Sequence, residues 1–246
     1  MAFMNKYTLW DGDVLCYRAA WSEKDSDEET AKLKLDELIG HIIEEVDPWG
    51  AKSHRKFFLT GKGNFRNDIA KTAVYKGNRK DLEKPAHLDA LRNHLIFKYD
   101  ALVTQGCEAD DAIGIHATYY GYDRVVIISV DKDFEQIPTT IFNPTHWTYK
   151  TVDEWNALKN FYKQILVGDR VDNIVGICGV GPVKAEKLLA SCDSEKALYW
   201  VCVEEYLKAM VPGDFNAMIV AQERVLENAR LLWIQRFNGE MWEPPK

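Results

Sequence analysis

Hydrophobic and polar positions follow two periodicities in the first 150 residues of this chain. Short apolar runs at residues 6–10, 56–60, 101–105 and 124–130 predict strands, and the last run is continuous, as in buried parallel strands. Segments 14–21, 28–46, 87–99 and 108–121 instead have the apolar spacing of helices. This alternation predicts an α/β fold, with a mostly parallel sheet flanked by helices.

The pattern changes near residue 150. Beyond it the strand signal stops, and residues 152–168, 182–192, 194–210 and 214–237 all have helical spacing. We therefore expect an α/β core over residues 1–150 and a helical region over 151–246. No clear linker separates the two regions.

Composition excludes some classes of protein. The chain has 246 residues and no apolar run long enough to cross a bilayer. Its first ten residues lack the apolar core of a signal peptide, so we expect a cytoplasmic protein. The five cysteines are odd in number and lack C-x-x-C spacing, which predicts buried reduced thiols.

The net charge of −7 hides an uneven distribution. Residues 51–80 carry nine Lys or Arg and one acid, Asp68, with Phe65 and Tyr75 among the cations. Such a block is often only a solvated face, but interleaved aromatic residues are also typical of phosphate-binding surfaces. The negative total therefore does not exclude a nucleic acid partner.

Acidic residues follow three of the predicted strands and also occupy a later loop. The eight are Asp11, Glu108, Asp110, Asp111, Asp131, Asp133, Asp169 and Asp172. The carboxyl ends of parallel strands meet at one edge of a sheet, so we expect these groups to converge there. Carboxylate oxygens suit hard divalent cations such as Mg²⁺ or Mn²⁺, and the absence of accompanying His or Cys argues against zinc.

Each acid also has a structural interpretation. Glu108, Asp110 and Asp111 suit the first turn of a helix, and Asp133 suits an N-cap. Asp169 and Asp172 suit turns in their loop, and Asp13 is expected to cap the helix that follows it. These interpretations predict no convergence, and carboxylates gathered without a cation would repel one another. The metal interpretation is therefore favoured.

A glycine turn follows the loop that contains Asp169 and Asp172. Gly179 and Gly181 precede a helix that carries Lys184 and Lys187 one turn apart. Glycine allows close backbone approach, and a helix N-terminus offers free N–H groups to phosphate. A G-x-G turn is weak evidence alone, but its place after the carboxylate loop favours phosphate binding.

Together these motifs resemble a known family. "DGDVL", "YKGNR", "EADDAIG", "SVDKDFEQI" and "GDRVDNIVGICGVGPVKAEKLL" are similar in order to the 5′→3′ exonuclease and flap endonuclease family. That family includes phage exonucleases and the N-terminal nuclease domain of bacterial DNA polymerase I. "NFR" and the closing "RFN" are most similar to exonucleases of short-tailed lytic phages.

The resemblance implies a hydrolase with two Mg²⁺ ions, for which Mn²⁺ substitutes, producing 5′-phosphates. Asp11, Glu108 and Asp110 match ligands of the first ion. Asp131, Asp133 and Asp169 match those of the second, with Asp111 and Asp172 in support.

The resemblance also implies how DNA is held. Residues 62–98 match a helical arch in which Lys76 and Arg79 contact the reacting phosphate and Tyr75 stacks on the terminal base. Residues 166–190 match a helix–three-turn–helix motif that grips duplex backbone and in relatives binds K⁺. The expected DNA contacts are Arg66, Tyr75, Lys76, Arg79, Gly179, Gly181, Lys184 and Lys187. The expected substrates are DNA duplexes with 5′ ends, nicks or 5′ flaps, and RNA–DNA hybrids stay open as a further substrate. The protein is expected to act as a monomer. Its expected role is phage DNA replication, primer removal or host DNA degradation.

One position departs from the family pattern. Gly61 stands after the second strand, where the family usually has an acid that helps to hold the first ion. Two alternatives therefore stay open beside the nuclease. One is a weakly active or inactive relative that binds branched DNA. The other is a phosphatase with aspartates after its first strand, which "DGDVLC" does not favour because the expected hydroxyl residues are missing.

Overall fold

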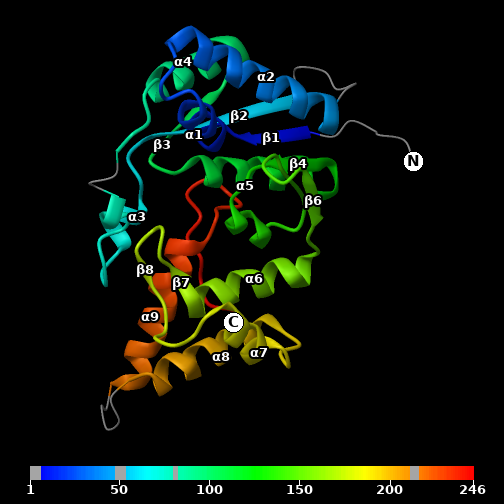
Figure 1. Cartoon of the computed structure of the whole chain (residues 1–246). Helices are drawn as coiled ribbons and strands as arrows, with labels where there is room; N and C mark the ends of the chain where they lie inside the picture. The colour runs from blue at the N-terminus through cyan, green and yellow to red at the C-terminus, as the bar shows by residue number, and fades with distance from the viewer. Residues whose placement is uncertain (1–6, 48–53, 80–82, 211–215) are drawn as a thin grey trace. The chain divides into compact units, whose positions relative to one another are not determined.

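The computed structural model describes residues 7–47, 54–79, 83–210 and 216–246. The chain forms two compact units, each assembled from discontinuous segments (Figure 1). The first unit comprises Met1–Asn64, Glu83–Val152 and Ile234–Asn238, and the second comprises Phe65–Leu82, Asp153–Trp233 and Gly239–Lys246. The boundary expected near residue 150 lies close to the junction at 152–153. The expected arch, 62–98, divides between the units, and its residues 80–82 lie outside the described residues.

The first unit is built on a six-stranded sheet with the order β3–β2–β1–β4–β5–β6. Its strands are β1 (Tyr7–Asp11), β2 (Arg55–Lys62), β3 (Leu102–Gln105), β4 (Val125–Ile128), β5 (Thr140–Asn143) and β6 (Thr148–Thr151). All neighbouring strands pair in parallel except β6, which is antiparallel to β5. The predicted mostly parallel sheet is confirmed. The sequence missed β5 and β6, because both are short and every residue of β6 is exposed.

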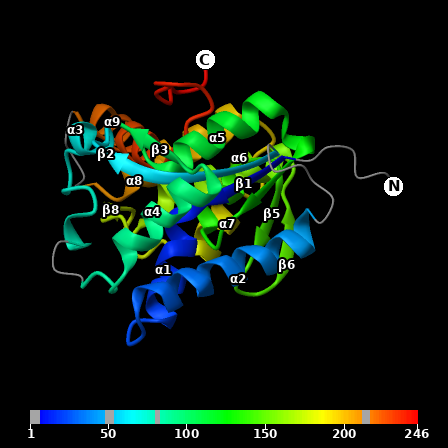
Figure 2. The same ribbon diagram turned by 90° about the horizontal axis from the view of Figure 1, so that it is seen from above.

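Helices cover both faces of this sheet (Figure 2). They are α1 (Gly12–Ser22), α2 (Glu28–Val46), α4 (Leu88–Tyr99) and α5 (Ala109–Tyr120), with the 3₁₀ turns η3 (Tyr122–Arg124) and η4 (Lys132–Gln136). On one face α1, α2 and α4 pack over Trp10 and Phe57, burying side chains such as Leu35 and Leu95. On the other face α5 packs against the central strands. This burial of apolar surface fixes the strands whose ends carry the acids.

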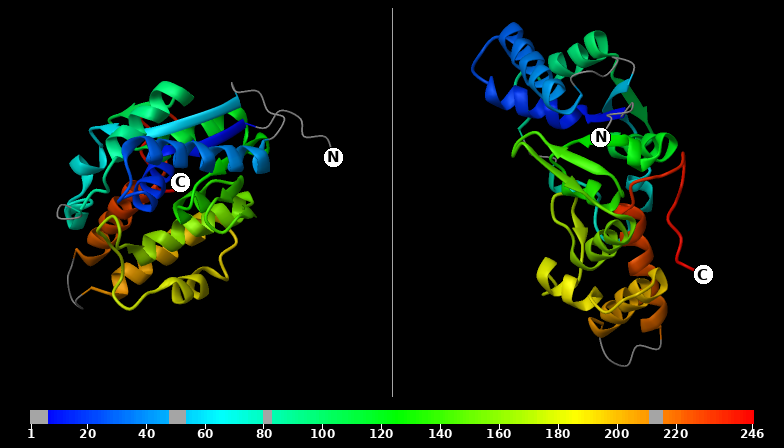
Figure 3. Two further views of the ribbon diagram at one scale, coloured as in Figure 1. Left: turned by 45° about the horizontal axis from the view of Figure 1, so that its top comes forward. Right: turned by 90° about the vertical axis from the view of Figure 1, so that its right-hand side faces the viewer.

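The second unit is mainly helical (Figure 3). It contains α3 (Arg66–Ile69), η2 (Gly77–Arg79), α6 (Glu154–Val167), the hairpin β7 (Gly168–Asp169) and β8 (Ile174–Val175), α7 (Pro182–Leu189), α8 (Glu195–Lys208) and α9 (Ala217–Leu232). Its core is an apolar cluster that includes Phe161, Tyr162, Cys202 and Val225. The β7–β8 hairpin was not predicted, because two-residue strands leave no periodic signal.

The last predicted helix is too long. The prediction placed it over 214–237, but α9 ends at Leu232 and Trp233 is extended, with φ −66° and ψ 121°. Residues Ile234–Asn238 belong to the first unit instead. The N–H groups of Ile234 and Gln235 bind side chains of that unit rather than helix carbonyls. Long-range hydrogen bonds therefore replaced the helical ones that the periodicity predicted.

No helix among the described residues is both long and apolar enough to cross a membrane. The five cysteines form no disulfide, as predicted. Their predicted burial holds only for Cys16 and Cys202. Cys178, which lies within the glycine turn, is exposed.

Candidate active site

The end of β1 is joined to the end of β4 through Asp11. Asp11 is the last residue of β1 and caps α1, with Oδ1 accepting a hydrogen bond from the N–H of Val14 at 3.2 Å. Its Oδ2 accepts a hydrogen bond of 2.8 Å from the hydroxyl of Ser129, which follows β4. Because β1 and β4 are parallel neighbours in register, these two strand ends lie side by side.

Ser129 extends this link to the next pair of acids. Its hydroxyl oxygen accepts a 3.1 Å hydrogen bond from the N–H of Asp131. Asp131 in turn caps η4 by accepting a 2.9 Å hydrogen bond from the N–H of Asp133. Ser129 was not among the predicted site residues. Its signal is a hydroxyl at the end of an otherwise apolar strand.

The third acidic group lies at the N-terminus of α5. Glu108 is its N-cap and Asp111 its third residue, and the two form a capping box. The structural interpretation therefore holds for both residues. The N–H of Ala109 donates to the hydroxyl of Thr60 at 3.0 Å, and this bond ties the helix start to β2. Asp110 lies in the same first turn, at the carboxyl edge of the sheet.

Asp13 does not cap the following helix, so that prediction is wrong. Its Oδ2 accepts a 2.8 Å hydrogen bond from the N–H of Thr60, and its Oδ1 pairs with Arg92 of α4. Asp11 takes the cap instead. Asp13 therefore joins α1, β2 and α4.

Oxygen atoms of carboxylates suit a hard divalent cation, and Asp11, Glu108, Asp110, Asp131 and Asp133 all belong to the first unit. Across the described part of the chain, however, no three Asp, Glu, His or Cys side chains are gathered closely enough to hold an ion. The ends of β1 and β4 and the N-terminus of α5 bring these carboxylates to one edge of the sheet. Metal coordination by them belongs to the proposal below.

Asp169 and Asp172 lie in the second unit, around the β7–β8 hairpin. Asp169 Oδ1 accepts hydrogen bonds from the N–H groups of Val171 at 2.6 Å and Asp172 at 3.2 Å. This is the turn-forming role that the sequence left open. That Asp169 is a ligand of the second ion, with Asp172 in support, stays a prediction.

Asp172 is the centre of a polar cluster within the second unit. Its carboxylate accepts a 2.9 Å hydrogen bond from the hydroxyl of Tyr75 and pairs with the side chains of Lys76 and Arg79. The backbone joins as well, since the N–H of Lys76 donates to the carbonyl of Asp172 at 2.9 Å. The segment 74–79 is thus docked on the hairpin.

Two predicted DNA contacts have other roles in this structure. Arg66 is 3% exposed, and its guanidinium donates to the carbonyls of Leu231 and Trp233 at 2.8 Å each. Tyr75 is 6% exposed, so little of its ring surface is open in this structure, and its stacking on a terminal base stays a prediction. Both side chains instead hold the basic segment within the second unit. Periodicity could not show this, because the partners are about 100 to 165 residues away.

The glycine turn leads into α7. Gly179 has φ +74°, a conformation that favours glycine, and Gly181 is the N-cap. Lys184 and Lys187 are exposed, whereas Ala185 and Leu189 face the core. The predicted helix–three-turn–helix segment, 166–190, therefore runs from the end of α6 through the hairpin to α7. Its DNA-binding role stays a prediction.

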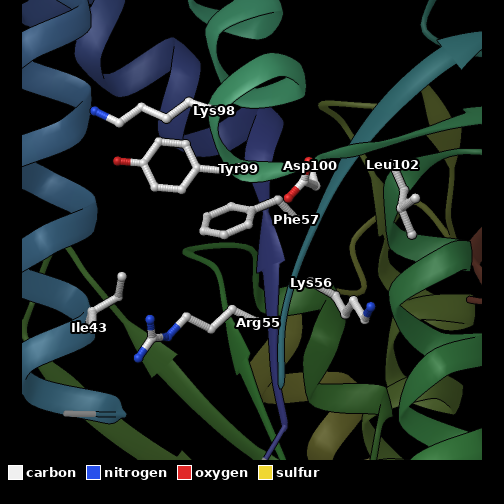
Figure 4. A pocket seen from close by; sticks show the side chains of 8 residues that line it. All are labelled: Ile43, Arg55, Lys56, Phe57, Lys98, Tyr99, Asp100 and Leu102. Carbon is white, nitrogen blue, oxygen red and sulfur yellow. The ribbon is translucent and has the colours of Figure 1, made fainter. Parts of the chain in front are cut away.

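A cavity of about 620 Å³ lies at the opposite end of the strands. It is lined by residues at the starts of β2 and β3 and at the end of α4, including Arg55, Lys98 and Leu102. The rings of Phe57 and Tyr99 lie between Lys98 and Arg55 (Figure 4). Because the acids occupy the carboxyl ends, this cavity is separate from the candidate active site.

Comparison with known proteins supports the family suggested by the motifs. No model of a known protein family matches the sequence. The exonuclease of Escherichia phage T7 is 29% identical over 198 residues, which cover 70% of this chain and 63% of that protein. This chain thus spans less than two thirds of that relative. The flap endonuclease Xni of Shewanella baltica is 27% identical over 80% of this chain and 78% of its own length.

The fold has solved counterparts. A bacteriophage T5 flap endonuclease, in a pseudo-enzyme–product complex with DNA and metal ions, superposes with a TM-score of 0.64 at 19% identity, covering 92% of this chain and 88% of that chain. The likeness extends over the sheet and the helical unit. The sequence motifs and these relatives indicate similarity to 5′→3′ exonucleases and flap endonucleases, and the solved structure shares the fold of this chain.

Proposed function

We propose that the chain is a divalent-metal-dependent 5′→3′ exonuclease with flap endonuclease activity on DNA. The observation that carries the proposal is the link from Asp11 through Ser129 to Asp131. It joins carboxylates from two strand ends at the edge where α/β enzymes place their sites. The named relatives with exonuclease and flap endonuclease activity support this reading.

Five residues of the first unit would hold two divalent ions: Asp11, Glu108, Asp110, Asp131 and Asp133. Ions bound there would supply an activated water and stabilise charge on the leaving oxygen of a phosphodiester. Mg²⁺ is the proposed ion and Mn²⁺ a substitute, since both prefer oxygen ligands. The T5 neighbour, solved with DNA and metal ions, supports a metal-dependent reaction.

The second unit would hold the DNA. Lys76 and Arg79 would exchange Asp172 for a substrate phosphate, because a phosphate offers the same anionic oxygens to both cations. The N-terminus of α7, with Lys184 and Lys187, would bind the backbone of the duplex without reading bases. A K⁺ ion at the glycine turn is part of the same proposal.

A second candidate is a relative that binds branched DNA without cutting it. Gly61 favours it, because an acid is expected there and a side chain does not fit (see Discussion). Retention of the other carboxylates favours the nuclease.

One experiment separates the two functions. End-labelled duplex, nicked and 5′-flap DNA would be incubated with the protein in Mg²⁺ or in EDTA. The nuclease releases nucleotides or flaps with 5′-phosphates in Mg²⁺ only. A binder shifts the branched DNA in a gel in both buffers and leaves it intact.

A further inference from the structure

The segment Ile234–Arg236, hereafter the return segment, is buried in the first unit. Its residues are 3%, 4% and 7% exposed. They come one residue after the end of α9 and return to the first unit more than 80 residues after its previous segment ends at Val152. None of these residues belongs to the proposed ligand set, so their burial needs another explanation.

The return segment binds the turn that carries two proposed ligands. The side-chain oxygen of Gln136 accepts a 2.9 Å hydrogen bond from the N–H of Ile234. The carbonyl of Gln136 accepts another of 2.7 Å from the guanidinium of Arg236, which also donates to the carbonyl of Ile234. Gln136 is the last residue of η4, which begins directly after Asp131 and contains Asp133.

The same segment binds the helix that carries the other proposed ligands. The N–H of Gln235 donates to Asp111 Oδ1 at 3.1 Å, and the N–H of Glu108 donates to Asp111 Oδ2, also at 3.1 Å. Asp111 is fully buried, with each carboxylate oxygen accepting a backbone hydrogen bond. One carboxylate therefore connects the return segment to the cap of α5, beside Asp110.

Close packing requires a glycine at the same contact. A Cβ at Gly114 of α5 would lie 2.4 Å from the carbonyl oxygen of Gln235 and 2.7 Å from Cγ2 of Ile234. The return segment therefore lies directly against the helix. Any side chain at residue 114 would push the two apart.

We infer that the return segment is a clasp that sets the spacing between Glu108 and Asp110, at the start of α5, and Asp131 and Asp133, at the start of η4. Asp111 and Gln136 are then positioning residues rather than ligands. The inference rests on the proposed metal-dependent function. Residues that orient ligands commonly tune metal affinity, and losing one costs roughly 10- to 100-fold.

The test uses two variants of the full chain, Arg236→Met and Gly114→Ala. Arg236→Met keeps an apolar stem but removes both donors to carbonyls. Arg236→Lys is the milder variant, because a single ammonium group replaces only part of the hydrogen bonding of the guanidinium. Gly40→Ala is the matched glycine control, since nothing lies within 4 Å of a Cβ there. Leu91→Ala is the control for general loss of stability, because Leu91 is buried in the core on the other face of the sheet.

Two readouts are taken without DNA: Mn²⁺ affinity by calorimetry, and amide hydrogen exchange without metal. We expect Arg236→Met and Gly114→Ala to raise exchange at residues 108–112 and 131–136 and to weaken Mn²⁺ binding by roughly 10- to 100-fold. Arg236→Lys should fall between wild type and Arg236→Met. Leu91→Ala should lower the melting temperature but keep Mn²⁺ affinity.

Unchanged exchange and affinity in folded Arg236→Met and Arg236→Lys would overturn the clasp. A loss of Mn²⁺ affinity in Leu91→Ala equal to that in Arg236→Met would also overturn it, because general destabilisation would then explain the loss. If wild type binds no Mn²⁺ and cuts no DNA, the proposed function fails. Hydrogen exchange at residues 108–112 and 131–136 then still decides whether the return segment holds these two regions in place.

Discussion

The carbonyl oxygen of Thr104 occupies the space that a side chain at Gly61 would need. A Cβ at Gly61 would lie 1.9 Å from that oxygen and 2.9 Å from Cγ1 of Val103. Gly61 lies in β2, where the pairing with β3 shifts register between Leu59 and Lys62. Its φ is not in the left-handed region, so the backbone conformation does not require glycine at this position. Close approach of two strands demands it instead.

We therefore expect Gly61→Ala and Gly61→Asp to lower the free energy of unfolding together, by at least about 1–3 kcal/mol. Restoring an acid at this position should not improve Mg²⁺ response, because the strand must shift to admit any side chain. Urea unfolding of both variants, with Gly40→Ala as control, measures the loss. A Gly61→Asp protein as stable as wild type, with a lower Mg²⁺ midpoint, would contradict this account.

Asp131→Asn and Asp133→Asn should abolish cleavage while DNA affinity stays within about threefold, because the proposed grip lies in the other unit. Removing a charge from the acidic edge should leave metal-free stability equal or higher. Turnover and gel-shift affinity are compared with Asp123→Asn, an exposed acid of the same unit. Near-normal turnover in both variants would remove these two residues from the ligand set.

Asp172→Asn should loosen the docking of segment 74–79 on the β7–β8 hairpin, even without metal or DNA. The amide keeps the size of the carboxylate but loses the charge that pairs with Lys76 and Arg79. Trypsin should then cut the segment severalfold faster, which mass spectrometry detects. Asp68→Asn, which changes the one acid within residues 51–80, is the control. Equal digestion of Asp172→Asn and wild type would show that Asp172 does not hold the segment.

Lys184→Ala and Lys187→Ala should weaken DNA binding about equally across sequences and lower the salt slope by up to about 1 each. The control is Lys208→Ala at the end of α8, where the lysine pairs with Glu205. Binding is measured by fluorescence anisotropy over a range of KCl concentrations. An unchanged slope in Lys184→Ala would show that α7 does not contact the phosphates.

Glu227 of α9 should make stability depend on pH. Burial opposes its ionisation, but the N–H and hydroxyl of Thr72, the N–H of Lys71 and Arg224 together lower its pKa below the ordinary value. A lowered folded pKa stabilises the fold above the unfolded pKa of about 4.3, and this contribution is lost as pH falls. Melting temperatures of wild type and Glu227→Gln should differ most near pH 7 and converge toward pH 3. A constant difference would rule out this linkage.

Local sequence signals were sufficient for most helices and for the strands that carry acids. The prediction for residues 28–46 matches α2 at both ends, because Asp27 caps it and its apolar spacing is regular. Asp11 at the end of β1 and Asp131 beyond β4 also follow from short apolar runs. Parallel pairing then places them at one edge, which a chain of alternating strands and helices already implies.

Tertiary structure alone decided the rest. The periodicity of α9 continues past Leu232, yet Ile234–Arg236 leaves the helix because Gln136 and Asp111, 98 and 124 residues earlier, bind its N–H groups. Arg66 looks like a DNA contact in sequence but donates to carbonyls more than 160 residues away. Gly61 looks like a lost ligand until Thr104 is placed beside it. Each of these roles depends on which distant groups the fold brings into contact, and no local pattern of residues records that.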